Sequence, residues 1–218
     1  MYYLNLHTHK FTENSSVIEI VNQYPLEANT NLPNYSIGIH PWHINKSEYE
    51  NELQIINNLI NNKECLAVGE CGLDKNFDVD FSFQTKVFIE QLKIAETYNK
   101  PVILHIVKAY EELLQILKQE KITVPIVLHG FSKNIELANA LIKNNIYLSF
   151  GKYLFLSEAT AKAFEKLPID NLFLETDNSN YAINEVYIKA SEIKNISVQD
   201  LQVNIYNNFL RVFKKKIK

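Results

Sequence analysis

Eight short apolar runs, most of them separated by amphipathic helical patterns, are the feature that most constrains the fold of this chain. The later runs are continuously apolar, which is typical of parallel strands buried on both faces. Parallel strands joined by helices indicate repeated βαβ units, and eight such strands favour a closed barrel over an open sheet. The predicted strands are Tyr2–Leu6, Val17–Val21, Tyr35–Ile39, Leu66–Gly69, Val102–Leu104, Ile126–Leu128, Ile146–Phe150 and Leu172–Leu174.

The helical patterns fill most of the intervals between the later strands. They cover Glu48–Asn62, Phe81–Asn99, Tyr110–Gln119, Asn134–Lys143, Glu158–Lys166, Ile183–Ile193 and Val198–Lys215. A crossover with its helix needs at least about 10–12 residues, whereas the connections Lys10–Ser16 and Asn22–Asn34 are too short or marginal. We therefore predict an α/β fold, a distorted TIM-type (β/α) barrel with shortened early connections and one or two outer helices missing.

Composition narrows the class of protein further. The 218 residues contain no repeat or linker, so we expect a single barrel domain over residues 1–218, and the net charge of -3 argues against a protein that coats nucleic acid. No run approaches the ~20 apolar residues of a membrane span, and the N-terminus lacks a signal-peptide pattern. Cys65 and Cys71 are expected to be reduced thiols. These features predict a cytoplasmic protein without a membrane or an obligate protein partner.

Side chains that bind metals stand at the ends of five predicted strands. The set consists of four histidines and two acids: His7, His9, Glu70, His105, His129 and Asp177. The carboxyl ends of the strands of a parallel barrel converge on one rim, and active sites lie on that rim. We therefore expect a metal site at the C-terminal rim, with the six side chains brought together.

The mixture of ligands indicates which chemistry such a site supports. His7 and His9 are two residues apart on a strand and so face the same way. Imidazoles and carboxylates without a thiolate suit Zn, Mn or Mg, and six ligands are too many for one catalytic zinc. Two ions that share a bridging carboxylate would use all six. Such pairs, about 3.5–4 Å apart, activate water and clamp the oxygens of a phosphoester.

Each of these residues also has a plain structural interpretation when it is taken singly. Glu70 could be a solvated acid in a turn at Gly69–Gly72, and Asp177 could cap the helix that follows it. A lone His105 or His129 after an apolar run is more often a hydrogen-bonded core histidine. The metal hypothesis therefore depends on their joint placement.

The same residues resemble the TatD-type metal-dependent hydrolases, a family that includes TatD-related deoxyribonucleases. The likeness follows the same order along nearly the whole chain and implies a distorted TIM-type barrel with an amidohydrolase-like metal site at the C-terminal rim. The segments that carry it are Asn5–His9, Gly38–Pro41, Gly69–Asp74, Pro101–His105, His129–Ser132 and Leu174–Asp177, with Phe81–Gln84 and Phe209–Phe213 in support.

This resemblance assigns roles to the residues and implies two divalent cations, Mg, Mn or Zn. One ion would be bound by His7, His9, Glu70 and Asp177. The second ion would be bound by His105 and His129, with Glu70 as the bridge. The catalytic residues would be Glu70 and Asp177, because Asp177 would also help to deprotonate the attacking water. His40 would contact a substrate phosphate, or would only support the turn before Pro41; His43 is expected to be an ordinary surface residue.

Three departures from the family pattern affect the substrate more than the metal site. Asn5 stands where the family usually has Asp, which removes an acid that would orient a ligand. Ile106-Val107-Lys108 replaces a segment that often reads Ser-Arg-Asp, and Lys108 supplies a point charge in place of the arginine fork. The loop after Asp177 lacks a common proline. The substrate is accordingly expected to be DNA or a small phosphoester.

Three functions are compatible with these patterns. The leading interpretation is a metal-dependent hydrolase of phosphoester bonds, a TatD-type deoxyribonuclease with a two-metal-activated water. A metal-dependent esterase, lactonase or amidohydrolase acting on a small substrate or an aminoacyl ester is the second, although many such enzymes bridge their metals with a modified lysine. A non-catalytic metal-binding barrel is the third, in which the basic run Lys214–Lys218 would contact anionic partners.

Overall fold

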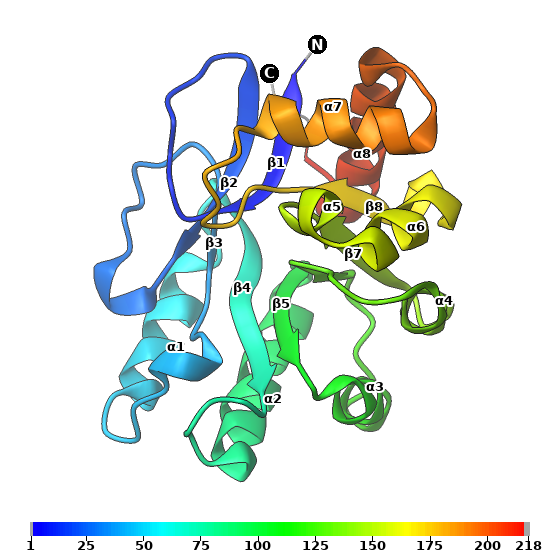
Figure 1. Cartoon of the computed structure of the whole chain (residues 1–218). Helices are drawn as coiled ribbons and strands as arrows, with labels where there is room; N and C mark the ends of the chain where they lie inside the picture. Colours follow the sequence, from blue (N-terminus) through cyan, green and yellow to red (C-terminus); the bar gives the residue numbers. More distant parts are fainter. Residues whose placement is uncertain (1, 216–218) are drawn as a thin grey trace. The chain divides into compact units, whose positions relative to one another are not determined.

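The computed structural model describes residues 2–215, so the end of the basic run at 216–218 lies outside the described residues. Parallel strands alternate with helices along the chain (Figure 1). The strands are β1 (Tyr3–Thr8), β2 (Val17–Gln23), β3 (Tyr35–Ile37), β4 (Cys65–Asp74), β5 (Val102–Val107), β6 (Ile126–Leu128), β7 (Ile146–Phe150) and β8 (Leu172–Leu174). The α-helices are α1 (Tyr49–Leu59), α2 (Phe81–Tyr98), α3 (Tyr110–Gln119), α4 (Ile135–Lys143), α5 (Tyr153–Leu156), α6 (Glu158–Lys166), α7 (Ile183–Lys194) and α8 (Val198–Phe213).

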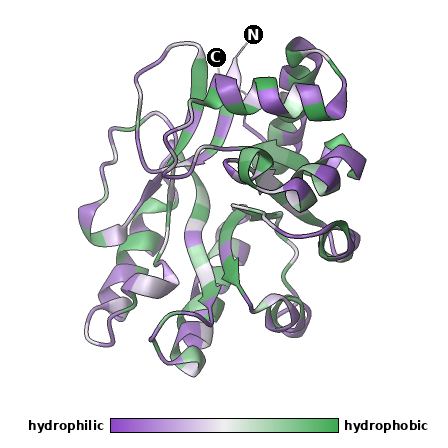
Figure 2. Cartoon of the chain, in the orientation of Figure 1, coloured by the Kyte–Doolittle hydropathy of each residue, from purple (hydrophilic) through white to green (hydrophobic). Residues whose placement is uncertain are grey.

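Hydropathy explains why these segments adopt these structures. Most strand residues are apolar, with polar positions in β1, β2 and β4, whereas most helices carry an apolar and a polar side (Figure 2). An apolar face of this kind packs on the sheet and leaves the polar face in water. Among residues 2–215, no helix is both long enough and apolar enough to cross a bilayer.

The contacts divide the chain into two compact units. The first consists of residues 1–21 and 127–218, and the second of residues 22–126. The boundaries fall inside β2 and β6. That residues 1–218 form a single domain stays a prediction.

The first unit joins the first strand of the chain to the last. Strand β1 pairs in parallel with β2, and β7 pairs in parallel with β8. Thr8 at the end of β1 forms a β-bridge with Asp177 after β8, and the Asp177 amide donates to the His7 carbonyl at 2.9 Å. Helices α7 and α8, orange and red in Figure 1, pack against β1. The buried Tyr187 hydroxyl of α7 exchanges two hydrogen bonds with the Leu4 backbone, both 3.1 Å long.

The second unit is built on the parallel strands β3, β4 and β5. Helix α2 packs on β4 and carries two buried glutamines. Gln84 hydrogen-bonds both the backbone amide and the carbonyl of Asp74. Gln91 does the same for Ile39. These glutamines replace ladder bonds that the backbone lacks at those positions, since a buried polar backbone group needs a partner. The strand ends are thereby fixed in place.

All the predicted strands and helices are found, but the ends of several strands differ, and helix α5 was not predicted. Strand β4 does not end at Gly69 but continues to Asp74, and β5 continues to Val107. Gly69 and Gly72 have φ of 141° and 150°, and an added Cβ would lie 2.4 Å from the Ile103 carbonyl oxygen and 1.9 Å from that of His105. These glycines permit close approach to β5 and form no turn.

The shortened early connections are also confirmed. The chain between β1 and β2 has no helix, and the chain between β2 and β3 has only the 3₁₀ turn η1 (Pro25–Glu27). Short 3₁₀ turns η2 (Pro41–His43) and η3 (Ile169–Asn171) occur elsewhere. The fold is therefore a distorted TIM-type (β/α) barrel, in which side chains that follow parallel strands are the ones positioned for function.

Candidate metal-binding groups

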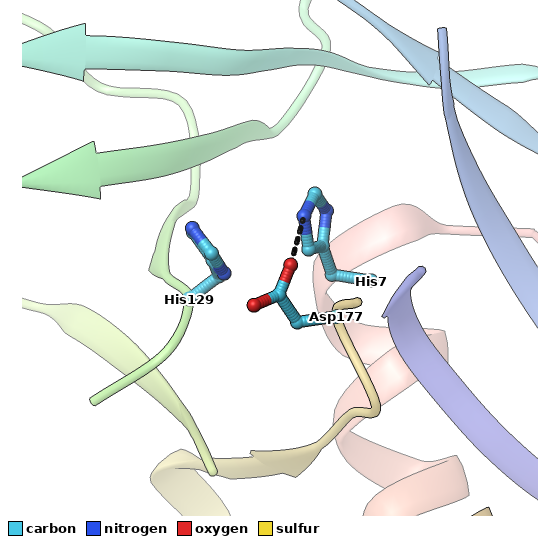
Figure 3. A group of neighbouring side chains, drawn as sticks. All are labelled: His7, His129 and Asp177. Atoms are coloured by element: carbon cyan, nitrogen blue, oxygen red, sulfur yellow. Dashed lines mark ion pairs between the residues drawn. The ribbon is translucent and has the colours of Figure 1, made fainter. Parts of the chain in front are cut away.

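The first unit brings together His7, His129 and Asp177 (Figure 3). Their ligand atoms all lie within 4.8 Å of one another. His7 Nε2 is 3.9 Å from Asp177 Oδ1, and the rings of His7 and His129 are 4.3 Å apart. His9 lies beside them, with Nε2 3.4 Å from the same Asp177 oxygen. Four of the six predicted ligands thus gather in this unit.

Backbone geometry fixes Asp177. It adopts the left-handed conformation at φ 53°, which is uncommon for a residue with a side chain, and its amide and carbonyl both pair with the end of β1. Its interpretation as a helix cap is wrong, because α7 begins at Ile183 with Ala182 as the N-cap. A left-handed non-glycine residue held by its surroundings is typical of functional positions.

Asn5 takes part in this positioning in a way that an aspartate cannot. Its amide donates to Thr176 Oγ1 at 2.8 Å, while its carbonyl oxygen accepts from the Thr176 amide at 2.9 Å. Both residues are buried. The amide side chain therefore holds the residue that precedes Asp177, so the departure from the family pattern at this position retains a positioning contact.

Sequence reasoning missed two side chains of this group. Glu175 is 1% exposed; its Oε1 accepts from the Gly130 amide at 2.8 Å and lies 3.3 Å from His129 Nδ1. Lys152 Nζ lies 3.5 Å from Asp177 Oδ2. A carboxylate behind a metal-binding histidine orients the ring and makes it a stronger ligand. Both residues follow or end a strand, which is the signal that would have found them.

The second unit brings together His40, Glu70 and His105, again with ligand atoms within 4.8 Å of one another. One oxygen, Glu70 Oε1, lies 3.2 Å from His40 Nε2 and 3.0 Å from His105 Nδ1. Glu70 is 3% exposed in the middle of β4, and its amide donates to Asn22 Oδ1 at 2.7 Å. Its interpretation as a solvated acid in a turn is therefore wrong.

His40 belongs to this group and also supports the turn before Pro41. Its Nδ1 accepts from the Trp42 amide at 3.1 Å, so the other ring nitrogen faces Glu70. His43 is exposed, as predicted for a surface residue. Lys108 is exposed directly after β5, in the left-handed conformation at φ 54°. Contact of His40 or Lys108 with a substrate stays a prediction.

Asp74 ties the second group to the neighbouring loop. Its Oδ2 lies 3.2 Å from His105 Nε2 and accepts from the Trp42 indole nitrogen at 2.7 Å. Burial alone would raise the pKa of Asp74, but hydrogen bonds from Trp42, the Asn76 amide and His105 outweigh it and lower that pKa. The carboxylate is therefore held ionised next to a ring that can bind a metal.

The donor atoms of both groups fit a divalent cation. Imidazole nitrogens and carboxylate oxygens are the ligands of Zn, Mn and Mg sites, and the acids offset part of the charge of an ion. The structure brings His129 to His7 and Asp177, whereas the resemblance pairs His129 with His105. Which ion each histidine serves stays a prediction.

The fold and the homologues define the class of protein, a metal-dependent hydrolase. A relative from Mycoplasma genitalium, named as an uncharacterized metal-dependent hydrolase, is 29% identical over 92% of this chain and 84% of its own length. Another from Escherichia coli K12, named in the same way, is 29% identical over 82% of this chain and 73% of its own length. The chain is an enzyme of this hydrolase class.

More particularly, the chain belongs to the TatD-related DNase family, whose model matches residues 3–214. The solved structure of a TatD homologue from Escherichia coli K12 is similar, with a TM-score of 0.81, 24% identity and coverage of 98% of both chains. A TatD-family hydrolase from Entamoeba histolytica has a TM-score of 0.79 at 16% identity, over 97% of this chain and 98% of that one. These structures share the fold of this chain.

Proposed function

We propose that this protein is a metal-dependent phosphoesterase, and most specifically a deoxyribonuclease of the TatD type. The observation that carries the proposal is the group His7, His129 and Asp177, whose ligand atoms lie within 4.8 Å of one another although they come from three distant parts of the sequence. A second group, His40, Glu70 and His105, supports a second ion. The family description, a TatD-related DNase, supports DNA as the substrate, with a small phosphoester as the alternative.

The proposed cofactors are two divalent cations, Mg, Mn or Zn, bound by His7, His9, Glu70, His105, His129 and Asp177. When bound, such ions lower the pKa of the attacking water and offset the negative charge that develops on a phosphate. The bridging role of Glu70 stays a prediction of the resemblance.

The chain's own residues supply the remaining chemistry in this proposal. Asp177 accepts the proton of the attacking water, because its carboxylate is partly exposed and is held by the bridge to β1. Lys152 lies 3.5 Å from Asp177 Oδ2 and fixes the orientation of that carboxylate. Glu175 orients His129 through Nδ1, which leaves Nε2 as the ligand atom.

The test is turnover of single-stranded DNA by the wild type and by Asp177→Asn, each with added Mg, Mn or Zn. We expect the variant to lose at least about 100-fold in kcat, the lower end of what general-base catalysis supplies. Asp170→Asn is the matched control, because Asp170 is exposed and its one ion pair among residues 2–215 is with Arg211 at 3.7 Å. Equal activity of wild type and Asp177→Asn contradicts the mechanism. Turnover of carboxylic esters or lactones, with no turnover of DNA, contradicts DNA as the substrate.

We also propose that the protein acts in the cytoplasm without a membrane or an obligate protein partner. Cys65 and Cys71 support a reducing compartment, because both are buried thiols. Cell fractionation tests the location, and size-exclusion chromatography of the active protein tests whether it works alone.

A further inference from the structure

Two stacked aromatic rings are exposed beside the second metal-binding group. Trp42 and Phe77 have centroids 5.5 Å apart and an interplanar angle of 18°. Trp42 remains 44% exposed and Phe77 41% exposed. A single exposed aromatic residue needs no explanation, but two rings that stack on each other while both stay partly exposed form an apolar patch with ring surface open to solvent.

Asp74 holds the Trp42 indole and the turn that carries Phe77. Its Oδ2 accepts from the Trp42 indole nitrogen at 2.7 Å, and its Oδ1 accepts from the Asn76 amide at 2.8 Å. Its carbonyl oxygen accepts from the Phe77 amide at 3.4 Å, which closes the turn that carries Phe77. The Trp42 indole and the backbone that carries the Phe77 ring are therefore held before any ligand binds, which reduces the conformational entropy lost when one does.

The rings adjoin the histidines of the candidate metal group. The Trp42 ring lies 4.8 Å from the His40 ring and 5.4 Å from the His105 ring, both approximately at right angles to it. The Asp74 carboxylate that holds the indole is the one 3.2 Å from His105 Nε2. A substrate phosphate near these histidines would thus have an aromatic surface beside it.

We propose that Trp42 and Phe77 form a stacking platform for a nucleobase of the substrate, next to the phosphate that is cleaved. This inference rests on the proposed function and names the part of a nucleic acid that binds here. Every base has a flat π face, so stacking tolerates any sequence and requires an unpaired base. The proposed substrate is therefore a single strand, read without strong sequence preference.

The chain offers a direct probe, because Trp42 is its only tryptophan. The full-length Asp177→Asn variant, with Mg²⁺ added, is titrated with a short oligothymidylate while tryptophan fluorescence is recorded. A second titration uses an oligomer of the same length whose sugars carry no bases. We expect the oligothymidylate to quench Trp42 and the abasic oligomer to leave its emission unchanged.

Substitution of the second ring gives the energetic test. Removing a stacking ring is expected to weaken binding of the oligothymidylate about 5- to 100-fold. Phe77→Ala in the same background should show this loss, and Phe77→Leu, which keeps apolar bulk, should show most of it. Abasic binding should not change in either variant. Phe11→Ala is the matched control, because Phe11 is also 41% exposed but lies in the other unit.

The outcomes separate this inference from the proposed function. Equal affinity for both oligomers, or emission that does not respond to the bases, overturns the platform even if the wild type cleaves DNA. Base-dependent quenching and the loss in Phe77→Ala support the platform even if the wild type cleaves no DNA, in which case only the proposed function fails. Trp42→Phe, which keeps a ring but loses the bond to Asp74, should retain most of the preference for bases in a fluorescence-independent binding assay. Complete loss of that preference in Trp42→Phe contradicts stacking.

Discussion

Replacing Glu175 by glutamine tests whether a buried acid that is not itself a predicted ligand adjusts the metal site. The substitution keeps the shape of the side chain and removes its charge. Glu175 Oε1 accepts from the Gly130 amide at 2.8 Å and lies 3.3 Å from His129 Nδ1. A glutamine carbonyl can still accept from Gly130, so the change acts mainly on His129.

The expected magnitude follows from these contacts. A hydrogen bond to a charged group contributes about 1.5–3 kcal/mol, against about 0.5–1.5 kcal/mol for a neutral pair. The difference of roughly 1–1.5 kcal/mol corresponds to about 10-fold, the lower end of the 10- to 100-fold effect of losing such an orienting partner. We therefore expect Glu175→Gln to bind metal about 10-fold more weakly.

The stability of the metal-free protein should rise on this substitution or stay unchanged. The second carboxylate oxygen of Glu175 is buried without a hydrogen-bond partner among residues 2–215, so the charge is costly to bury. Glutamine leaves a neutral amide at that position, which costs less to bury than a charge, so the metal-free variant should melt no lower than the metal-free wild type.

Competition with a chromophoric chelator measures the metal affinity, and calorimetry of the metal-free proteins measures the melting temperature. Glu158→Gln is the control, because the Glu158 side chain is 81% exposed and, within the described part of the chain, forms an ion pair with Lys162 alone. Unchanged metal affinity in Glu175→Gln, or a metal-free melting temperature several degrees lower, would refute this reasoning.

Three further predictions use the same structure. Lys152→Met should lower kcat/KM about 5-fold, equivalent to the ~1 kcal/mol of a partly exposed ion pair, because it removes the cation 3.5 Å from Asp177 Oδ2. Burial, and then a nearby carboxylate, raises the pKa of Glu52 above its ordinary 4.5. Folding of the protein is therefore favoured below pH 4.5, where Glu52 is protonated, and is penalised as the pH rises through the raised pKa. Glu52→Gln should therefore raise the melting temperature at pH 7 and lose this gain near pH 4. Burial, and then an adjacent carboxylate, raises the pKa of the Cys71 thiol, so Cys71 should react with a thiol reagent only after unfolding.

Each of these three predictions has an outcome that would contradict it. Steady-state kinetics with unchanged kcat/KM in Lys152→Met would show that the ion pair has no role in turnover. A melting-temperature gain in Glu52→Gln that is the same at both pH values would exclude ionisation as its cause. Rapid modification of Cys71 in the folded protein, followed by mass spectrometry, would contradict its burial.

The sequence predicts the elements well because their signals are local. Apolar runs such as Ile146–Phe150 and helical periodicity such as Phe81–Asn99 depend on neighbouring residues only. The absent early helices follow from chain length alone. The grouping of His7 with Asp177, and of Glu70 with His105, could be anticipated because residues at the carboxyl ends of parallel strands lie on one edge of the sheet, whereas their role as metal ligands stays a prediction.

The rest depends on contacts that no local pattern records. Gly69 and Gly72 resemble a turn in the sequence, but the nearby β5 backbone makes them part of a strand. The contacts of Asp74 with Trp42 and His105 depend on side-chain direction across different elements. Such residues lack the typical metal-ligand spacing, which is why sequence reasoning passed over them.

The composition of the first unit has a consequence for biosynthesis. Residues 22–126 are contiguous and can pack as soon as they leave the ribosome. Residues 1–21 belong to the other unit and cannot pack in it until the segment from residue 127 onward has been synthesised. His7 is synthesised 170 positions before Asp177, so no prematurely terminated translation product that stops short of Asp177 carries the full set of proposed metal ligands. Hydrolytic capacity would thus arise only after Asp177 has been synthesised.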